Sequence, residues 1–276
     1  MEFNVSADLV YNAEEAGTLV LNIRPLKVIK ETLLIDPRTI NYVDYFSDMN
    51  RLLMLPVSEP GEIRISYNAT ALNEFNYVDF SNLGPSSISQ MDPSVLLYLN
   101  PSRYCQSDKL LRFTMHLFGH IENEFEKVIS ITEWIYTNVE YLSGSTTSGT
   151  SAYDTITEQA GVCRDFAHLG IALCRALDIP ARYCSVYAYN LEPADFHACF
   201  EAWLSGHWII FDATKLAPLN GFVKISMGRD AADTSIANLF GKIIPQSTNI
   251  NSYKSQGVIE PVFYYPGSTI GLSYIE

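Results

Sequence analysis

The 276-residue sequence predicts an α+β protein, with a β-rich N-terminal domain over residues 1–100 and a mixed domain over residues 101–276. Two observations predict this fold class. In the first part, apolar and polar residues alternate in short runs separated by Pro and Gly, as in β-strands. In the second part, segments with helical apolar stripes precede short strand-like runs. This order indicates an α+β domain and not a doubly wound sheet.

The N-terminal strands are clearest in residues 18–24 (TLVLNIR) and 61–70 (GEIRISYNAT). Both runs are rich in β-branched and aromatic residues, which favour strands. Residues 81–94 (SNLGPSSISQMDPS) are rich in Pro, Ser and Asn and indicate a connection. We therefore expect the domain boundary near residue 100.

The second domain begins with predicted helices. Residues 124–142 (EFEKVISITEWIYTNVEYL) place apolar residues at helical spacing, and a second amphipathic helix is predicted from about residue 163. Pro180 ends that helix, because proline cannot continue the hydrogen-bond ladder. Three strands are expected to follow, at residues 181–189 (ARYCSVYAY), 197–204 (HACFEAWL) and 207–214 (HWIIFDAT).

Composition limits the classes of function. Hydrophobic residues make up 47% of the chain and charged residues 18%, so the chain can bury a large core. The formal net charge is −13 and the basic residues are scattered. Non-specific binding to nucleic acid or to anionic membranes needs basic patches, so neither is expected.

The sequence also bears on location. Residues 1–17 (MEFNVSADLVYNAEEAG) lack the basic region and apolar stretch of a secretory signal. No uncharged apolar run approaches the ~20 residues that span a bilayer. The five cysteines are odd in number and form no C-x-x-C pair, which favours reduced thiols. We therefore expect a cytoplasmic protein.

Cys163 is the candidate nucleophile. Within "EQAGVCRDFAHLGIALC" it follows a Gly-Val turn and stands where the helix is predicted to begin. The unpaired N–H groups and the positive dipole end of a helix N-terminus favour a thiolate there. The same donors could hold the oxyanion formed when a thiolate attacks an amide. Gly161 allows a tight turn and a close approach of substrate to the backbone.

A base and an orienting carboxylate follow from strand register. A two-residue turn at 205–206 (SG) would pair Leu204 with His207. His197 then becomes the diagonal neighbour of Asp212 on the same face of the hairpin. A carboxylate in that position orients an imidazole and fixes its tautomer. Cys163, His197 and Asp212 would together supply the nucleophile, base and orienter of a cysteine acyl-transfer enzyme.

Four ordered motifs resemble the core of the bacterial transglutaminase-like superfamily, whose members are usually described as candidate cysteine proteases. Residues 223–235 (VKISMGRDAADTS) resemble a segment that often follows this core. The β-rich first hundred residues resemble the N-terminal domain often attached to it. The motifs of the core are GVCRDFAHL (161–169), LDIPARYCSVY (177–187), DFHACFEAWL (195–204) and HWIIFDAT (207–214).

The resemblance implies a papain-like, transglutaminase-type core with Cys163 as nucleophile, His197 as general base and acid, and Asp212 as orienting carboxylate. The sequence departs from the family in two places. Cys199 stands where an aromatic residue, often Trp, is common after the histidine. Val162 and Arg164 stand where animal transglutaminases carry Gln and Trp beside the cysteine. We identify no match to their calcium-binding region or to their C-terminal β-domains in this sequence. The second departure weakens the case for protein cross-linking.

Five other residues have simpler interpretations. Asp165 is expected to cap the helix start. Trp134 could line a substrate groove but is expected in the core. Gln159 could donate to the oxyanion but is expected in a solvated loop. His168 is expected at the surface or in the core, and His207 is expected to be exposed.

A metal site is a weaker alternative. Cys163, His197 and Cys199 carry zinc-ligand side chains, but the closely spaced ligand pairs of zinc sites are missing. We expect neither metal nor cofactor. The sequence favours hydrolysis of a peptide or protein amide through a thioester on Cys163. Transamidation, and a non-catalytic protein-binding module of the same fold, stay open, and so does the oligomeric state.

Overall fold

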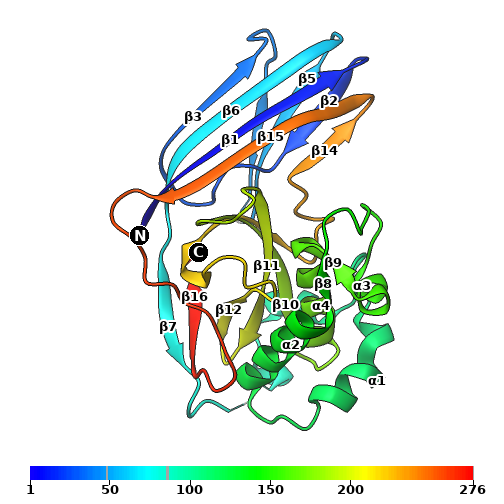
Figure 1. Ribbon diagram of the computed structural model, residues 1–276, viewed down its shortest axis with the longest axis vertical. Coiled ribbons are helices and arrows are strands. Elements are labelled where there is room, and N and C mark those ends of the chain that lie inside the picture. The colour runs from blue at the N-terminus through cyan, green and yellow to red at the C-terminus, as the bar shows by residue number, and fades with distance from the viewer. Residues whose placement is uncertain (48, 85–86, 276) are drawn as a thin grey trace.

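The computed structural model describes residues 1–47, 49–84 and 87–275. Two bodies are stacked along the long axis of the molecule, a β-sandwich and a mixed helix–sheet body (Figure 1). Each body has its own cluster of buried apolar side chains. None of the helices in the described ranges is long and apolar enough to cross a bilayer.

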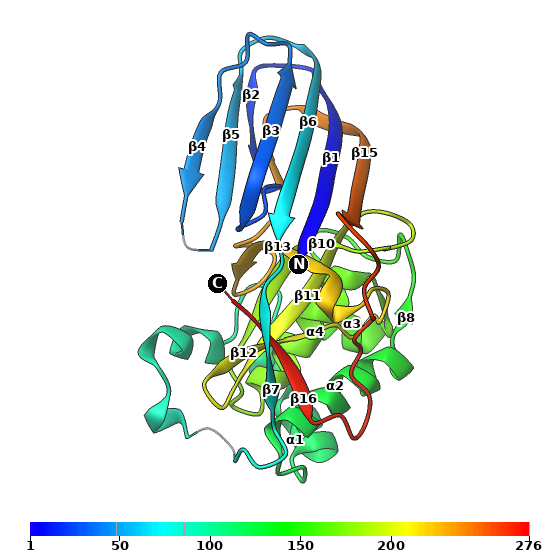
Figure 2. The ribbon, with the colours of Figure 1, turned by 90° about the vertical axis from the view of Figure 1, so that its left-hand side faces the viewer.

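The sandwich consists of two antiparallel four-stranded sheets, with strand orders β15-β1-β6-β3 and β14-β2-β5-β4 (Figure 2). In β1, every second side chain is buried, as the alternating sequence predicts. The strands are β1 (Glu2–Ala13), β2 (Gly17–Leu21), β3 (Val28–Asp36), β4 (Val43–Phe46), β5 (Arg51–Val57), β6 (Gly61–Leu72), β14 (Ala237–Phe240) and β15 (Ile243–Lys254).

The sandwich is completed by a distant part of the chain. β14 pairs with β2, and β15 pairs with β1 along eleven registered positions from Phe3↔Lys254 to Ala13↔Ile243. The mixed helix–sheet body lies below the sandwich in Figure 1 and is called the lower body here. Beside it, β7 (Phe75–Asp79) of the first part of the chain pairs with β16 (Ile270–Tyr274) near the C-terminus. The predicted domain boundary near residue 100 stays a prediction. Residues 237–254, which lie after that boundary in the sequence, contribute β14 and β15 to the sheets of the sandwich.

In the lower body, four helices precede an antiparallel sheet of strand order β12-β11-β10-β13, which confirms the predicted α+β class. Its main elements are α1 (Ser107–Phe118), α2 (Glu124–Asn138), α3 (Ala152–Glu158), α4 (Cys163–Arg175), β10 (Ala181–Ala188), β11 (Phe196–Leu204), β12 (His207–Phe211) and β13 (Phe222–Gly228). Shorter elements are β8 (Glu140–Tyr141), β9 (Ala160–Gly161) and the 3₁₀ turns Ile88–Gln90, Pro93–Leu99 and Leu219–Gly221.

Helix α4 lies at the centre of this body. All of its residues from Asp165 to Arg175 are buried, and it packs directly on β11. The closest approach is at Gly170, where a Cβ atom would lie 2.5 Å from Cε1 of Phe200. The Phe200 ring is itself fully buried and stacks on Phe211 of β12, so it has little room to move. The glycine therefore sets how closely the helix meets the sheet.

The substitution Gly170→Ala tests this packing. The added methyl group is expected to lower the free energy of unfolding by about 1–3 kcal/mol through overpacking, even though alanine favours helices. Denaturant unfolding followed by circular dichroism measures the change. Gly149→Ala, in an exposed loop, is the matched control and should change stability by less than about 0.5 kcal/mol. Equal stability of Gly170→Ala and wild type would show that the helix is not packed this closely.

Candidate active site

Cys163 is the first residue of α4, as the sequence predicts, and its side chain is half-buried. The other four cysteines are fully enclosed. The chain just before Cys163 is positioned by a short parallel ladder, in which Tyr141 of β8 pairs with Gly161 of β9. The backbone N–H of Leu142 donates to Gly161 O at 3.0 Å. This ladder fixes the approach of the chain to the helix start.

Asp165 caps the helix, in agreement with the prediction. Its Oδ2 accepts from the backbone N–H of Val162 at 3.0 Å and from the hydroxyl of Thr146 at 3.0 Å. Arg164 binds the same carboxylate at 3.0 Å and donates to the carbonyl of Thr147 at 2.6 Å. The Gly/Ser/Thr loop before α3 is thereby tied to the first turn of the nucleophile helix.

The hairpin has the predicted register. Leu204 pairs with His207, and the ladder continues to Phe200↔Phe211. The turn residues Ser205 and Gly206 have φ values of 49° and 89°, as a two-residue hairpin turn of type I′ requires.

This register brings His197 and Asp212 together. His197 Nε2 lies 2.9 Å from Asp212 Oδ2, and both side chains are buried. Asp212 is held in turn by Thr214, whose backbone N–H and hydroxyl each donate to the carboxylate at 2.9 Å. The carboxylate therefore cannot rotate away from the imidazole without losing several hydrogen bonds.

The surroundings of His197 favour its charged form. Burial opposes that form, but the charge and hydrogen bond of Asp212 outweigh it, with a further contribution from Cys163, and the pKa of His197 rises to about 10. Because Nε2 faces Asp212, Nδ1 is the nitrogen left for the thiol. Within the described residues Nδ1 is buried without a hydrogen bond of normal geometry. An imidazolium beside the thiol is the arrangement that a thiolate nucleophile needs.

Tyr141 is a member of the site that the sequence analysis missed. Its hydroxyl lies beside both the backbone N–H and the thiol of Cys163, and its ring packs on Phe166, one turn along α4, at 5.7 Å between centroids. Burial, followed by the charge of Cys163, raises the pKa of Tyr141 to about 12. The phenol therefore stays a hydrogen-bond donor at neutral pH. In the sequence, Tyr141 falls at the end of the predicted helical segment 124–142, in an ordinary VEYL run that carries no sign of a site. In the structure the helix ends at Asn138, and Tyr141 lies in β8.

Comparison with known proteins identifies the family. Residues 113–213 match the transglutaminase-like superfamily, and residues 1–94 match the bacterial transglutaminase N-terminal domain. A crystal structure of a candidate cysteine protease from Cytophaga hutchinsonii is 46% identical, with a TM-score of 0.96. The alignment covers 100% of this chain and 98% of the other. The chain belongs to the transglutaminase-like superfamily.

Curated relatives match over shorter regions. An uncharacterized protein of Mycobacterium leprae is 28% identical over 116 residues, which are 39% of this chain and 42% of the relative. An uncharacterized protein of Mycobacterium tuberculosis is 33% identical over 130 residues, which are 42% of this chain and 41% of the relative. The aligned part of this chain thus spans less than half the length of either relative.

The position where the transglutaminase-like family often has an aromatic residue is part of the core here. Cys199 of β11 lies directly opposite Cys184 of β10, and both are buried. Burial, with the neighbouring Cys184, raises the pKa of Cys199 well above its usual value. This thiol therefore stays neutral, and its role is to pack in the core and not to take part in catalysis.

The other candidates take the expected places. His168 is buried between the rings of Tyr104 and Tyr183, and its Nε2 accepts from the backbone N–H of Ala231 at 3.1 Å. Burial holds its pKa well below the usual range, so it stays neutral. Trp134 packs against the core through an edge contact with Phe113.

Gln159 and His207 are exposed. Gln159 ends α3 in the left-handed conformation, with φ of 53°. Among the residues that the structure describes, no group of three or more His, Cys, Asp or Glu side chains is placed to hold a metal ion.

Iodoacetamide labelling tests the exposure and reactivity of Cys163. At neutral pH and in the folded protein, the reagent is expected to modify Cys163 before any other cysteine, because the other four are buried. Peptide mapping by mass spectrometry measures the order of labelling. Cys163→Ser should leave the native protein unlabelled, and denaturant should expose the remaining thiols. Earlier labelling of Cys174 or Cys199 would contradict the assignment.

Proposed function

We propose that this protein is a cysteine enzyme that hydrolyses peptide or protein amide bonds through a thioester on Cys163. The observation that carries the proposal is the contact of His197 Nε2 with Asp212 Oδ2 at 2.9 Å, beside a half-buried thiol at a helix start. Acyl transfer by a cysteine requires a base beside the nucleophile and a carboxylate that orients the base, and Cys163, His197 and Asp212 can supply these three groups.

In the first step, the Cys163 sulfur attacks the carbonyl carbon of the scissile amide. The thiol proton has moved to Nδ1 of His197 before the attack, because the surroundings favour the imidazolium, and Asp212 holds this cation through Nε2. Negative charge develops on the carbonyl oxygen. The hydroxyl of Tyr141 lies beside the backbone N–H and the thiol of Cys163, so this hydroxyl and this N–H are the donors we assign to that oxygen.

In the second step, the tetrahedral intermediate collapses. The C–N bond breaks, the leaving amine takes the proton from His197, and the acyl group remains on Cys163 as a thioester. His197 then takes a proton from water, and the hydroxide attacks the thioester carbonyl. Collapse of this second intermediate breaks the C–S bond and releases the carboxylic acid. The freed sulfur of Cys163 pairs again with the imidazolium of His197, which kept the proton taken from water.

Hydrolysis is preferred over transamidation because water suffices as the acyl acceptor. Excluding water requires a closed site, and the side chain of Cys163 is partly open to solvent. The relative from Cytophaga hutchinsonii bears the name of a candidate cysteine protease, which agrees with this preference. A reducing compartment such as the cytoplasm fits a nucleophilic thiol among five free cysteines, and this location is part of the proposal.

Substitution of the three central residues tests the enzyme proposal. Cys163→Ala and His197→Ala are each expected to lower turnover of a responsive amide substrate by about five to six orders of magnitude, because the residues act as a unit. Asp212→Asn should be milder, up to about 10⁴-fold. A peptide-amide library is screened with wild type and Cys163→Ala side by side, and mass spectrometry looks for the thioester.

Hydrolysis that persists in Cys163→Ala would place the chemistry elsewhere. No hydrolysis of any substrate in a broad library, together with no acyl adduct on the wild type, would favour a non-catalytic binding module. Transfer of the acyl group to an added primary amine in preference to water would favour transamidation.

Tyr141→Phe tests the second oxyanion donor. The variant keeps the ring that packs on Phe166 but loses the hydroxyl, so kcat is expected to fall by about 10²-fold while KM changes little. Steady-state kinetics on the substrate found above measure both constants. Tyr77→Phe, on an exposed position of β7, is the matched control. Unchanged kcat in Tyr141→Phe would remove this residue from the mechanism.

A further inference from the structure

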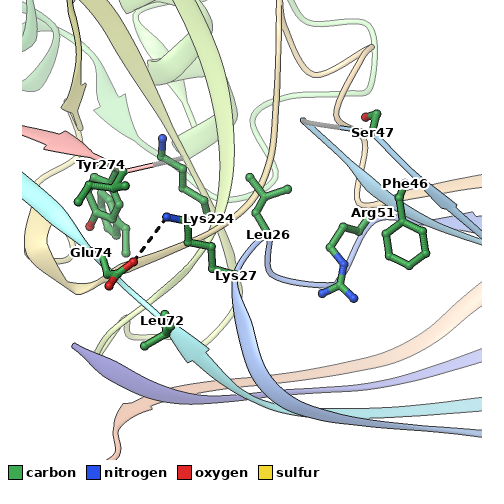
Figure 3. A pocket seen from close by; sticks show the side chains of 11 residues that line it. Leu26, Lys27, Phe46, Ser47, Arg51, Leu72, Glu74, Lys224 and Tyr274 are labelled. Atoms are coloured by element: carbon green, nitrogen blue, oxygen red, sulfur yellow. Dashed lines mark ion pairs between the residues drawn. The ribbon is translucent and has the colours of Figure 1, made fainter.

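A cavity lies between the two bodies, and Cys163, His197, Asp212 and Tyr141 are not among its lining residues. Its volume is about 310 Å³ (Figure 3). Its wall comes from the β2–β3 connection, from the ends of β4, β5 and β6 with the residues next to them, and from β13 and β16 of the lower body. This volume is at the small end of the range for ligand pockets. A water molecule takes up ~30 Å³ in the liquid, so the cavity has room for about ten non-hydrogen atoms of a ligand.

Most of the cavity surface is apolar. Its floor is buried, since Phe222 and Tyr274 are 0% and 7% exposed, whereas Phe46 at the mouth is 57% exposed. The apolar lining residues are Leu26, Phe46, Leu72, Phe222, Tyr274 and Ile275. A hollow of this kind favours the hydrocarbon part of a ligand, because it offers dispersion contacts and removes apolar surface from water.

Cationic side chains surround this apolar floor. Among the described lining residues, Lys27, Arg51 and Lys224 are basic and Glu74 is acidic. This is the reverse of the whole chain, which has 31 acidic and 18 basic residues. In Figure 3, Lys27, Glu74, Lys224 and Tyr274 gather at one end of the cavity, and Arg51 and Phe46 lie at the other.

Two of these cations have carboxylate partners outside the lining. Lys224 Nζ lies 2.5 Å from Glu201 Oε1, so its stem lines the cavity while its ammonium group is held by β11. Arg51 donates to Glu31 and to the carbonyl of Pro25, each at 2.7 Å. A guanidinium carries five N–H donors, so these two bonds do not exhaust it.

Lys27 is held more loosely. Its Nζ lies 3.5 Å from Glu74 Oε2, and the two side chains are 30% and 48% exposed. A solvated pair of this kind contributes little stability, and its more exposed member is the carboxylate. A ligand anion can therefore take the place of Glu74 at Lys27, while Glu74 turns to water. An ammonium ligand would instead have only the carboxylate of Glu74 on the lining, and Lys27 already pairs with that carboxylate.

We propose that the cavity between the bodies binds a small amphipathic carboxylate, with a hydrocarbon tail of about eight carbons on the apolar floor and the carboxylate on Lys27. The inference does not depend on the proposed catalytic function. The ligand would nevertheless touch Phe222, whose ring lies 5.6 Å from that of His197. The cavity thus adjoins the wall behind the imidazole.

Isothermal titration calorimetry with octanoate, octanamide and octylamine tests the proposal on the whole chain. Octanoate is expected to bind one to one and about tenfold or more tighter than octylamine, with octanamide between them. Lys27→Gln should weaken octanoate binding about tenfold, and Glu74→Gln should strengthen it. Lys30→Gln, on the exposed face of β3 outside this cavity, is the matched control and should bind as wild type does.

Leu72→Trp fills the cavity and should abolish binding of all three compounds. Thermal unfolding of each variant checks that it is folded. Octylamine binding as tightly as octanoate, or equal binding by wild type and Lys27→Gln, would overturn the carboxylate assignment. Octanoate that binds folded Leu72→Trp as it binds wild type, or that does not bind wild type at all, would overturn the site.

Discussion

The packing of α4 on β11 is the contact on which the arrangement of the site depends. The helix is buried from Asp165 to Arg175, and both of its ends are tied. Asp165 caps the start. At the other end, the buried guanidinium of Arg175 donates to the carbonyls of Ala181, Asn100 and Arg229. A helix fixed at both ends and seated closely on the sheet at Gly170 places the Cys163 thiol beside the imidazole of His197.

Buried charge is organised on the sheet itself. Glu201 of β11 is fully buried between Arg182 of β10 and Lys224 of β13, at 2.7 and 2.5 Å. Burial would raise the pKa of Glu201, but the two cations lower it to about 2. The carboxylate therefore stays charged, and the cluster joins three neighbouring strands. Because Lys224 also lines the cavity between the bodies, this cluster connects the sheet that carries His197 with the sandwich interface.

Much of the fold could be predicted from the sequence, because its signals are local. The helix that begins at Cys163, the end of α4 before Pro180 and the hairpin at residues 205–206 all follow from periodicity and turn residues. The return of residues 237–254 to the sandwich could not be predicted in the same way. In β15 most side chains are exposed, with burial at Ile243 and Ile250, so no apolar alternation marks the strand. Its place is set by pairing with β1, a contact between opposite ends of the chain.

In the candidate site, too, some features could be predicted from local sequence and others could not. The sequence by itself determined that a cysteine begins a helix and, through the period of two in the hairpin, that His197 and Asp212 share a face. Only the tertiary structure decided that Tyr141 reaches Cys163, since this depends on a two-residue parallel ladder with no pattern of its own. The cavity beside Lys27 likewise exists only where the two bodies meet. Local rules encode which residues share an element or a hairpin, whereas contacts between distant elements arise from how their surfaces pack.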